Sequence, residues 1–392
     1  MNDDSRSGAS RMAAGTQAGE FRENRVAQRG VLHERRESPE TRIVPLNRTH
    51  ECRPGMNAPL QALEADRLKL LPKAEVHLHL EGCFEAETIA QWAKAEGVAL
   101  PRPQEELFRF SGLADFLGFL DLACGLACTT GRLVELSYGL CQRLARNGTG
   151  YADVIFNPTH WHAWQGRLGA MLEAMDAGFT QAEQDGLPGV GLCVSLLRTQ
   201  SADEAIELVD SLRKLRHPRV VALSVDGNEA TAGRTGPRFA EAFRRASNDG
   251  LRRTVHAGES SGPEGVWDAV NFLGADRIDH GVRAAEDAAL VRMLADRQIP
   301  LGICPTSNLV LRVYPSMQEH PIEKLRTAGV RVSVNTDDPA LLGASLVGEY
   351  GLCRQTFGWT DETTKAVART SIESSFANQS VKANLLAALE SW

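Results

Sequence analysis

Residues 74–82 read AEVHLHLEG, a short apolar stretch with two histidines two positions apart and a Glu-Gly pair at its end. Alternate residues of a β-strand point to the same face, so His77 and His79 should project together from this strand. Two imidazoles side by side at a strand end form half of a metal site, although two buried structural histidines would show the same spacing. The other half of a metal site has to come from elsewhere in the chain.

From residue 68 onward, short β-type runs alternate with longer amphipathic stretches. The predicted strands are residues 75–80, 151–156, 190–197, 220–225, 253–257, 277–280, 300–304 and 330–335. Amphipathic stretches that predict helices are residues 88–96, 133–146, 202–215, 239–249, 263–273 and 285–296. Eight strands alternating with helices are typical of an α/β fold of the (β/α)8 TIM-barrel type, whose parallel strands are joined by helical crossovers.

Three other segments lie outside this alternation. Residues 95–131, between the first two strands, are expected to be helical and to cover the mouth of the barrel, and residues 346–392 to form additional helices on its outside. Residues 1–55 are rich in Arg, Glu, Ser and Gly and have no hydrophobic period, which predicts a disordered N-terminal extension. We expect the barrel domain to occupy residues 56–392, and an upstream extension absent from the native protein would explain the boundary at Met56.

Composition narrows the class of protein. The chain has 392 residues, of which 43% are hydrophobic and 24% charged, and a net charge of -7, which argues against nucleic acid as a partner. No run approaches the ~18 apolar residues of a membrane span, and the start of the chain lacks the apolar core of a signal peptide. The eight cysteines form no Cys-x-x-Cys pair. We therefore expect a cytoplasmic protein with reduced thiols and no membrane partner; the pattern leaves open whether it is a homo-oligomer.

Ionisable residues gather where the predicted strands end, which is where barrels of this type carry out chemistry. In chain order they are His77, His79, Glu81, His256, Glu259, Asp279, His280, Asp337 and Asp338. Three imidazoles and one carboxylate from this set suit a mononuclear zinc site with an open position for water, whereas a structural site tends to use ligands close in sequence, often thiolates. His160 and His162 follow the second strand and are further pocket candidates, while His217 and His320 lie beside prolines in apparent loops.

Several motifs together resemble the adenosine and adenine deaminases of the metal-dependent amidohydrolase superfamily. The motifs are HLH at residues 77–79, HAGE at 256–259, DHG at 279–281 and NTDDP at 335–339, supported by LPKAE at 71–75 and CPTSN at 304–308. The likeness covers residues 71–350, and the combination is specific although each motif is modest. It implies a zinc-dependent hydrolase that acts on the C–N bond of a purine.

The resemblance also implies roles for individual residues. One Zn²⁺ per chain would be held by His77, His79, His256 and Asp337, with His79 also bordering the substrate. Zinc lowers the pKa of a bound water towards about 7, which suits attack on C6 of the purine and release of ammonia. His280 would orient that water, and Glu259 would protonate N1. Asp338 would hydrogen-bond N7, the Gly227 N–H would contact N3, and Glu81 would lie on the ribose side of the pocket.

A two-metal amidohydrolase is the nearest rival within the superfamily. Such sites usually need a bridging group, often a modified lysine, at the end of the fourth strand. Residues 223–229 read LSVDGNE and contain no lysine. One catalytic metal is therefore the better interpretation.

Two departures from the family pattern leave the substrate open. Glu81 stands where adenosine deaminases usually carry Asp, and is the form common in adenine deaminases. Residues 224–229 read SVDGNE where adenosine deaminases tend to show DLAGDE, whereas NTDDP and the downstream Glu349-Tyr350 look more like the nucleoside enzymes. We expect conversion of adenosine to inosine, with adenine or a modified nucleoside such as aminodeoxyfutalosine as alternatives. A silent purine-binding barrel is disfavoured because every catalytic group is present.

Overall fold

The computed structural model describes residues 58–111 and 113–392, so the predicted extension at residues 1–55 and its boundary at Met56 lie outside the described residues. Eight strands form one parallel sheet whose spatial order follows the chain. They are β1 (Lys73–His79), β2 (Thr149–Phe156), β3 (Gly189–Leu197), β4 (Val220–Asp226), β5 (Arg252–Ala257), β6 (Arg277–His280), β7 (Leu301–Ile303) and β8 (Val332–Val334). Each predicted strand is present, with ends that differ by at most two residues.

The sheet closes where β1 meets the chain that leaves β8. Leu78 and Asp337 form a parallel bridge. The His79 N–H donates to the Asp337 carbonyl at 2.8 Å, and the Asp337 N–H donates to the His77 carbonyl at 3.2 Å. The predicted (β/α)8 barrel is therefore confirmed, and its closure places Asp337 directly beside the two histidines of β1.

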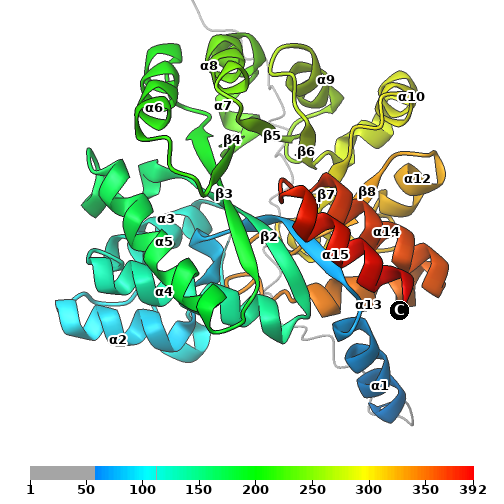
Figure 1. Ribbon diagram of the computed structural model, residues 1–392, viewed down its shortest axis with the longest axis horizontal. Coiled ribbons are helices and arrows are strands. Elements are labelled where there is room, and N and C mark those ends of the chain that lie inside the picture. Colours follow the sequence, from blue (N-terminus) through cyan, green and yellow to red (C-terminus); the bar gives the residue numbers. More distant parts are fainter. Residues whose placement is uncertain (1–57, 112) are drawn as a thin grey trace, which may run out of the picture. The chain divides into compact units, whose positions relative to one another are not determined.

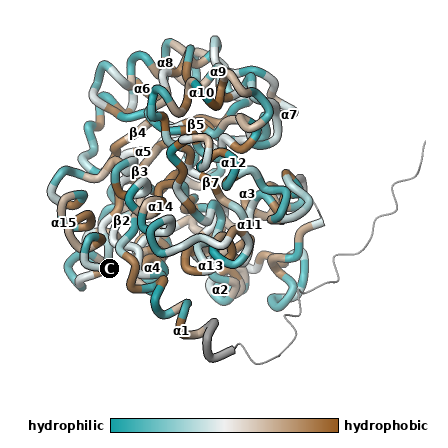
Figure 2. The backbone as a smooth tube through the Cα atoms, turned by 90° about the vertical axis from the view of Figure 1, so that its right-hand side faces the viewer, coloured by the Kyte–Doolittle hydropathy of each residue, from teal (hydrophilic) through white to brown (hydrophobic). Residues whose placement is uncertain are grey.

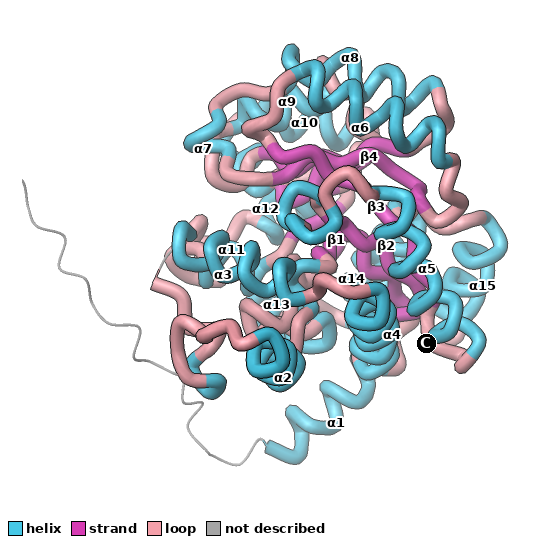
Figure 3. Tube along the Cα trace, turned by 90° about the vertical axis from the view of Figure 1, so that its left-hand side faces the viewer, coloured by secondary structure: helices cyan, strands magenta, loops and turns pink. Residues whose placement is uncertain are grey.

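Helices surround the strands, which lie at the centre (Figures 1 and 3). The α-helices are α1 (Ala58–Lys69), α2 (Ala86–Glu96), α3 (Leu113–Leu126), α4 (Thr130–Arg146), α5 (Leu168–Gln184), α6 (Ala202–Leu215), α7 (Glu229–Ala232), α8 (Gly236–Asn248), α9 (Pro263–Asn271), α10 (Ala288–Asp296), α11 (Pro305–Val310), α12 (Ile322–Thr327), α13 (Leu346–Phe357), α14 (Asp361–Ser374) and α15 (Gln379–Glu390). Short 3-10 turns are η1 (Glu81–Cys83), η2 (Gln104–Glu106), η3 (Pro158–His160), η4 (His162–Trp164) and η5 (Val282–Glu286).

The outer helices owe their packing to amphipathic spacing. In α8, Phe239, Ala242, Phe243 and Ala246 are buried at i, i+3, i+4 and i+7, so one stripe faces the barrel. The outer helices accordingly alternate between hydrophilic and hydrophobic segments along the chain (Figure 2). Burying a phenylalanine side chain contributes about 1.5–3 kcal/mol, so such a stripe fixes the helix on the sheet. The strands themselves are almost wholly buried, as expected for a parallel sheet covered on both faces.

The long insert between β1 and β2 is only partly helical. The expectation of helix throughout residues 95–131 is wrong for 97–111, where only the short turn η2 forms. Pro101 and Pro103 explain this, because proline lacks the N–H that a helix interior requires. The helical part, α3, carries Phe116 and Leu120 to the mouth of the central pocket, as predicted.

The predicted terminal helices are α13, α14 and α15. Helix α14 packs against β1 and β8, where the Ser371 hydroxyl accepts the Ala74 N–H at 3.1 Å. Across residues 58–111 and 113–392, no single helix is long and apolar enough to cross a membrane. Residues 115–126 and α4 pass that test as a pair, but the two are bent by 119°.

Candidate active site

Four side chains that could bind a metal converge at the C-terminal ends of β1, β5 and β8. The Nε2 atom of His256 lies 3.0 Å from His77 Nε2 and 2.9 Å from His79 Nε2. Asp337 Oδ1 lies 3.2 Å from His77 Nε2 and 3.4 Å from His79 Nε2. A tetrahedral zinc with ligands at about 2.0–2.1 Å separates its donor atoms by roughly 3.3 Å. Three imidazoles and a carboxylate at these separations fit one zinc ion.

His280 lies beside this cluster but faces a different direction. Its donor atom lies within 4.8 Å of those of His77, His256 and Asp337. Its Nε2 is 3.8 Å from Asp337 Oδ2, whereas the β1 histidines lie nearest to Asp337 Oδ1, and it is 3.5 Å from Glu259 Oε1. His280 therefore stands between the metal-ligand cluster and Glu259, which suits a group that handles the attacking water better than a fifth ligand.

Outer hydrogen bonds orient the clustered side chains. His77 Nδ1 lies 2.9 Å from the carbonyl in the middle of β7, which leaves its Nε2 facing the cluster. The Ser307 hydroxyl donates to Asp337 Oδ2 at 2.6 Å. His256 Nδ1 makes no hydrogen bond among the described residues, but the fully buried carboxylate of Asp279 lies 3.6 Å from it and can attract the ring electrostatically. Partners of this kind fix the ring orientation and raise the basicity of metal-binding histidines.

Helix α11 contributes a second row of contacts that sequence reasoning did not assign. Asn308 Nδ2 lies 3.3 Å from His280 Nδ1, and Asn308 Oδ1 lies 3.1 Å from His320 Nε2. His320 lies beside a proline in a loop, as expected from the sequence. It is nevertheless only 3% exposed and belongs to this network. Ser307 and Asn308 stood in the CPTSN motif, which was a usable signal, whereas nothing in the sequence marked His320.

Two residues at the C-terminal ends of the strands have strained backbone conformations. His280 and Asp337 both have a φ of 64°, which lies in the left-handed region that residues other than glycine seldom adopt. Such strain persists only where surrounding contacts impose it, and it gathers at functional sites. Gly82 allows the turn after β1 to approach Asp338, because a Cβ at Gly82 would lie 2.3 Å from the Asp338 Cα.

A pocket of about 380 Å³ opens onto these residues. Its floor contains the strand-end residues predicted for the site, including Glu81, Gly227, Glu259 and Asp338. Its apolar wall comes from Phe116, Leu117 and Leu120 of α3, with Leu311 and Val313 opposite. Of the two further candidates, His160 lines the pocket and its Nδ1 lies 2.7 Å from Asp121 Oδ1 of α3, whereas His162 is outside the lining.

Burial controls protonation in the pocket. Loss of solvation, reinforced by the neighbouring Asp337 carboxylate, raises the pKa of Glu259 to about 8. The same two causes raise the pKa of Asp338 well above its usual range, and burial raises the pKa of Glu81. Burial lowers the pKa of His280 to about 3. With these shifts, Glu259 favours its protonated form near neutral pH and His280 its neutral imidazole, while Asp338 is shifted towards its protonated form.

Comparisons with known proteins agree with this chemistry. The chain matches the family described as adenosine deaminase over residues 72–392. It is 35% identical over 333 residues to an adenine deaminase of Hahella chejuensis, covering 83% of this chain and 98% of the relative. It is 33% identical over 333 residues to an adenine deaminase of Streptomyces coelicolor, covering 83% and 97% of the two chains.

Two solved structures are similar over nearly their whole length. An adenine deaminase from Arthrobacter aurescens has a TM-score of 0.77 at 30% identity, covering 82% of this chain and 99% of that one. An amidohydrolase from Burkholderia ambifaria, solved with bound Zn, has a TM-score of 0.78 at 27% identity, covering 87% and 94%. With its three histidines and one aspartate arranged for one zinc, the chain belongs to the adenosine deaminase family and is a purine deaminase, a hydrolase acting on amidine C–N bonds.

Proposed function

We propose that this chain is an adenine deaminase, which converts adenine and water to hypoxanthine and ammonia. The relatives in Hahella chejuensis and Streptomyces coelicolor and the Arthrobacter aurescens structure are adenine deaminases, which favours the free base over the nucleoside that the sequence put first. The observation that carries the proposal is the environment of Glu81.

Glu81 keeps one carboxylate oxygen for a ligand. The side chain is 2% exposed, and its Oε1 accepts the Asn157 N–H at 2.7 Å and the Trp161 Nε1–H at 2.8 Å. Its Oε2 is buried and has no partner among the described residues. A buried acceptor without a hydrogen bond costs about 1–3 kcal/mol. Free adenine carries a ring N–H on its imidazole ring that can offset this cost, whereas a nucleoside has a sugar in place of that hydrogen.

The charge of the pocket disfavours a phosphate group. Glu81, Asp226, Glu259 and Asp338 all line it. The one lysine or arginine in the lining, Arg198, is 4% exposed and already engaged by neighbouring carbonyls. A nucleotide phosphate would therefore meet acidic side chains and no free lysine or arginine among the lining residues, which favours an uncharged substrate.

Three groups would fix the purine ring. Asp338, whose pKa is raised by burial and by Asp337, can in its protonated form donate to N7, which is an acceptor. The N–H of Gly227, at the end of β4, would approach N3. Glu259, also protonated near neutral pH, would face N1. Three donors that face three ring acceptors would select a purine whose N1, N3 and N7 carry no substituent.

The metal ligands follow from the convergent side chains. His77, His79, His256 and Asp337 would hold one zinc, with His79 also bordering the substrate. Zinc in such a site lowers the pKa of a bound water and so supplies a nucleophile at neutral pH. Ser307 and Asp279 would keep Asp337 and His256 in place.

Glu259 would transfer the proton to the purine, and His280 would orient the attacking water. Glu259 gives its proton to N1, which makes C6 electrophilic, and the water oxygen then bonds to C6. His280, kept neutral by burial, orients that water. As the C6–N bond breaks, one water proton restores Glu259 and the other leaves with the amino group as ammonia, while N1 of hypoxanthine keeps the proton first given by Glu259.

One sequence feature that favoured the nucleoside enzymes has a structural explanation instead. Glu349 does not line the pocket; its carboxylate accepts the Thr306 N–H at 3.1 Å, at the first turn of α11. It therefore supports the helix that carries Ser307 and Asn308. A group in that position gives no information on whether the substrate carries a sugar.

A substrate panel tests the proposal. We expect zinc-loaded enzyme to show a kcat/KM for adenine more than tenfold above those for adenosine, deoxyadenosine and aminodeoxyfutalosine, measured by ammonia release. Shortening Glu81 by one methylene, Glu81→Asp, moves the carboxylate by about 1.5 Å and should lower the adenine value by about tenfold or more with little loss for adenosine. Adenosine as the better substrate of the unaltered enzyme would overturn the proposal.

A further inference from the structure

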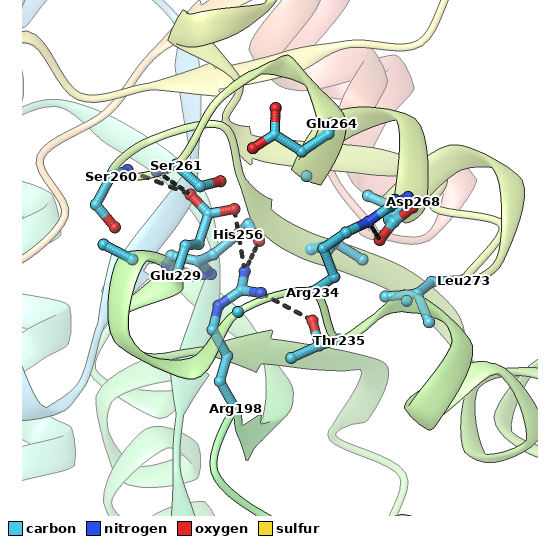
Figure 4. Close-up of a pocket in the computed structure, with 16 residues that line it drawn as sticks. Arg198, Glu229, Arg234, Thr235, His256, Ser260, Ser261, Glu264, Asp268 and Leu273 are labelled. Atoms are coloured by element: carbon cyan, nitrogen blue, oxygen red, sulfur yellow. Dashed lines mark hydrogen bonds and ion pairs between the residues drawn. The ribbon is translucent and has the colours of Figure 1, made fainter.

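Glu229 binds the loop that carries Glu259. Its side chain is 4% exposed, and its Oε1 accepts the Gly258 N–H at 3.0 Å. Its Oε2 accepts the N–H groups of Glu259 at 2.8 Å, Ser260 at 3.2 Å and Ser261 at 3.4 Å. One carboxylate therefore satisfies four consecutive backbone donors directly after β5. Figure 4 shows Glu229 pointing at the two serines.

Arg198 holds Glu229 from the other side. Its guanidinium is 4% exposed and lies 3.7 Å from Glu229 Oε1. Its Nε donates to the Gly227 carbonyl at 3.0 Å, its Nη1 donates to the Thr235 hydroxyl at 2.9 Å, and its Nη2 donates to the His256 carbonyl (Figure 4). The arginine thus connects the ends of β3, β4 and β5 and fixes the carboxylate relative to all three.

A second cavity explains why the loop depends on these polar contacts. A space of about 350 Å³ is lined by Ser260, Ser261, Glu264 and Gly265 as well as by Glu229. Glu259 lines the substrate pocket, Ser261 lines this second cavity and Ser260 lines both, so residues 259–261 run between the two spaces. Gly258, at φ of 64°, adds conformational freedom at the start of the loop.

We propose that Glu229, held by Arg198, is a positioning residue that fixes the Glu259 carboxyl against the purine ring. The inference rests on the proposed role of Glu259 as the proton donor. Hydrogen bonds to a charged acceptor are shorter and stronger than neutral ones, so four of them define the course of the backbone at Glu259. A displacement of about 1 Å in a reacting group can cost 10²-fold in rate.

The test is the substitution Glu229→Gln, measured as kcat, KM and zinc content with adenine as substrate. The amide places an NH2 group against backbone N–H donors, so we expect kcat to fall by about tenfold to 10²-fold with KM within about threefold and one zinc per chain retained. Asp268→Asn is the matched control. Asp268 is a buried carboxylate of the same cavity whose hydrogen-bonded partner is Arg234, and none of its hydrogen bonds goes to residues 258–261. We expect this control to leave kcat unchanged.

A double-mutant cycle with Glu259→Gln separates positioning from general damage. If Glu229 acts through the proton donated by Glu259, adding Glu229→Gln to Glu259→Gln should lower kcat by less than about threefold. The same fold loss in both backgrounds, or no loss in the single variant, would overturn the inference. If the amide variant does not fold, Glu229→Asp can replace it in the double-mutant cycle, because it keeps the charge but shortens the side chain.

The two proposals fail in different ways. An unaltered enzyme that is inactive on every 6-aminopurine would overturn the proposed function and this inference with it. An unaltered enzyme that deaminates adenine, together with additive losses in the cycle, would overturn only the role of Glu229. Non-additive losses with zinc retained support both.

Discussion

Buried charged side chains have different partners at the N-terminal and C-terminal ends of the barrel strands. Where β6 begins, Arg277 is fully buried and its Nη1 donates to Asp153 Oδ2 at 2.7 Å. The two oxygens of Asp153 also accept the Phe376 N–H, at 3.1 and 2.9 Å. Where the strands end, Glu81 Oε2 and Asp338 Oδ1 are buried without a partner among the described residues.

The difference separates structural charge from charge kept for a ligand. Asp153 and Arg277 form a fully buried ion pair, and Asp279 Oδ1 lies 3.4 Å from Arg277 Nε, although Arg277 Nη2 has no hydrogen-bond partner among the described residues. Removing Asp153 would therefore take away the nearest carboxylate of a buried cation. At the other end, burial and then the neighbouring carboxyl groups raise the pKa of Asp338, and one oxygen each of Glu81 and Asp338 has no partner among the described residues, which costs stability in the absence of substrate. Stability should therefore depend on the first end and catalysis on the second.

The largest effect should come from Asp153→Asn. Loss of the charge leaves the buried Arg277 with Asp279, at 3.4 Å, as its remaining carboxylate partner, and we expect the free energy of unfolding to fall by up to about 3–5 kcal/mol, with kcat per folded molecule unchanged. Denaturant unfolding measures this. The control Glu241→Gln removes an exposed partner of Arg244 and Arg245 on α8 and should cost less than about 1 kcal/mol. Equal costs for the two variants would contradict the contrast between the ends.

At the other end, Glu259→Gln should act on rate rather than stability. The amide keeps the shape of the side chain but cannot give up a proton, so we expect kcat for adenine to fall by at least about 10²-fold. Stability should change little, because the Glu259 carboxyl with its pKa of about 8 is mostly uncharged at neutral pH and the amide is uncharged as well. Ammonia release and thermal unfolding check the two halves. A variant that retains full activity would remove Glu259 from the mechanism.

The candidate metal-binding residues could be predicted from the sequence because the ends of the strands could be recognised in it. His77, His79, His256 and Asp337 each stand within three residues of an element end, and a (β/α)8 barrel brings all such ends to one rim. The strands were readable for the same reason, since β-type runs alternate with helical periods. The proline-broken segment 97–111 was misjudged as helix because the surrounding apolar pattern outweighed its two prolines.

The supporting layer was harder to predict because its contacts are long-range. Arg198 meets Glu229 across 31 positions, and His320 reaches the site only through Asn308. Neither pairing leaves a periodic or local pattern in the chain. The substrate was harder still, because it depends on one unpaired oxygen of Glu81, and the identity of the residue does not reveal which of its oxygens is already bonded.

The pH dependence of the reaction gives the finest test of the contrast between the two ends. The pKa of Glu259 is raised to about 8, first by burial and then by Asp337, and the protonated form is the one that can donate to N1. Raising the pH removes that form, so kcat should be half its plateau value near pH 8 and fall about tenfold per unit above it. Asp268→Asn should keep this descending limb because Asp268 lies away from Glu259, whereas Glu259→Gln should abolish it. A profile that stays flat to pH 10 in the unaltered enzyme would show that no buried acid at this rim supplies the proton.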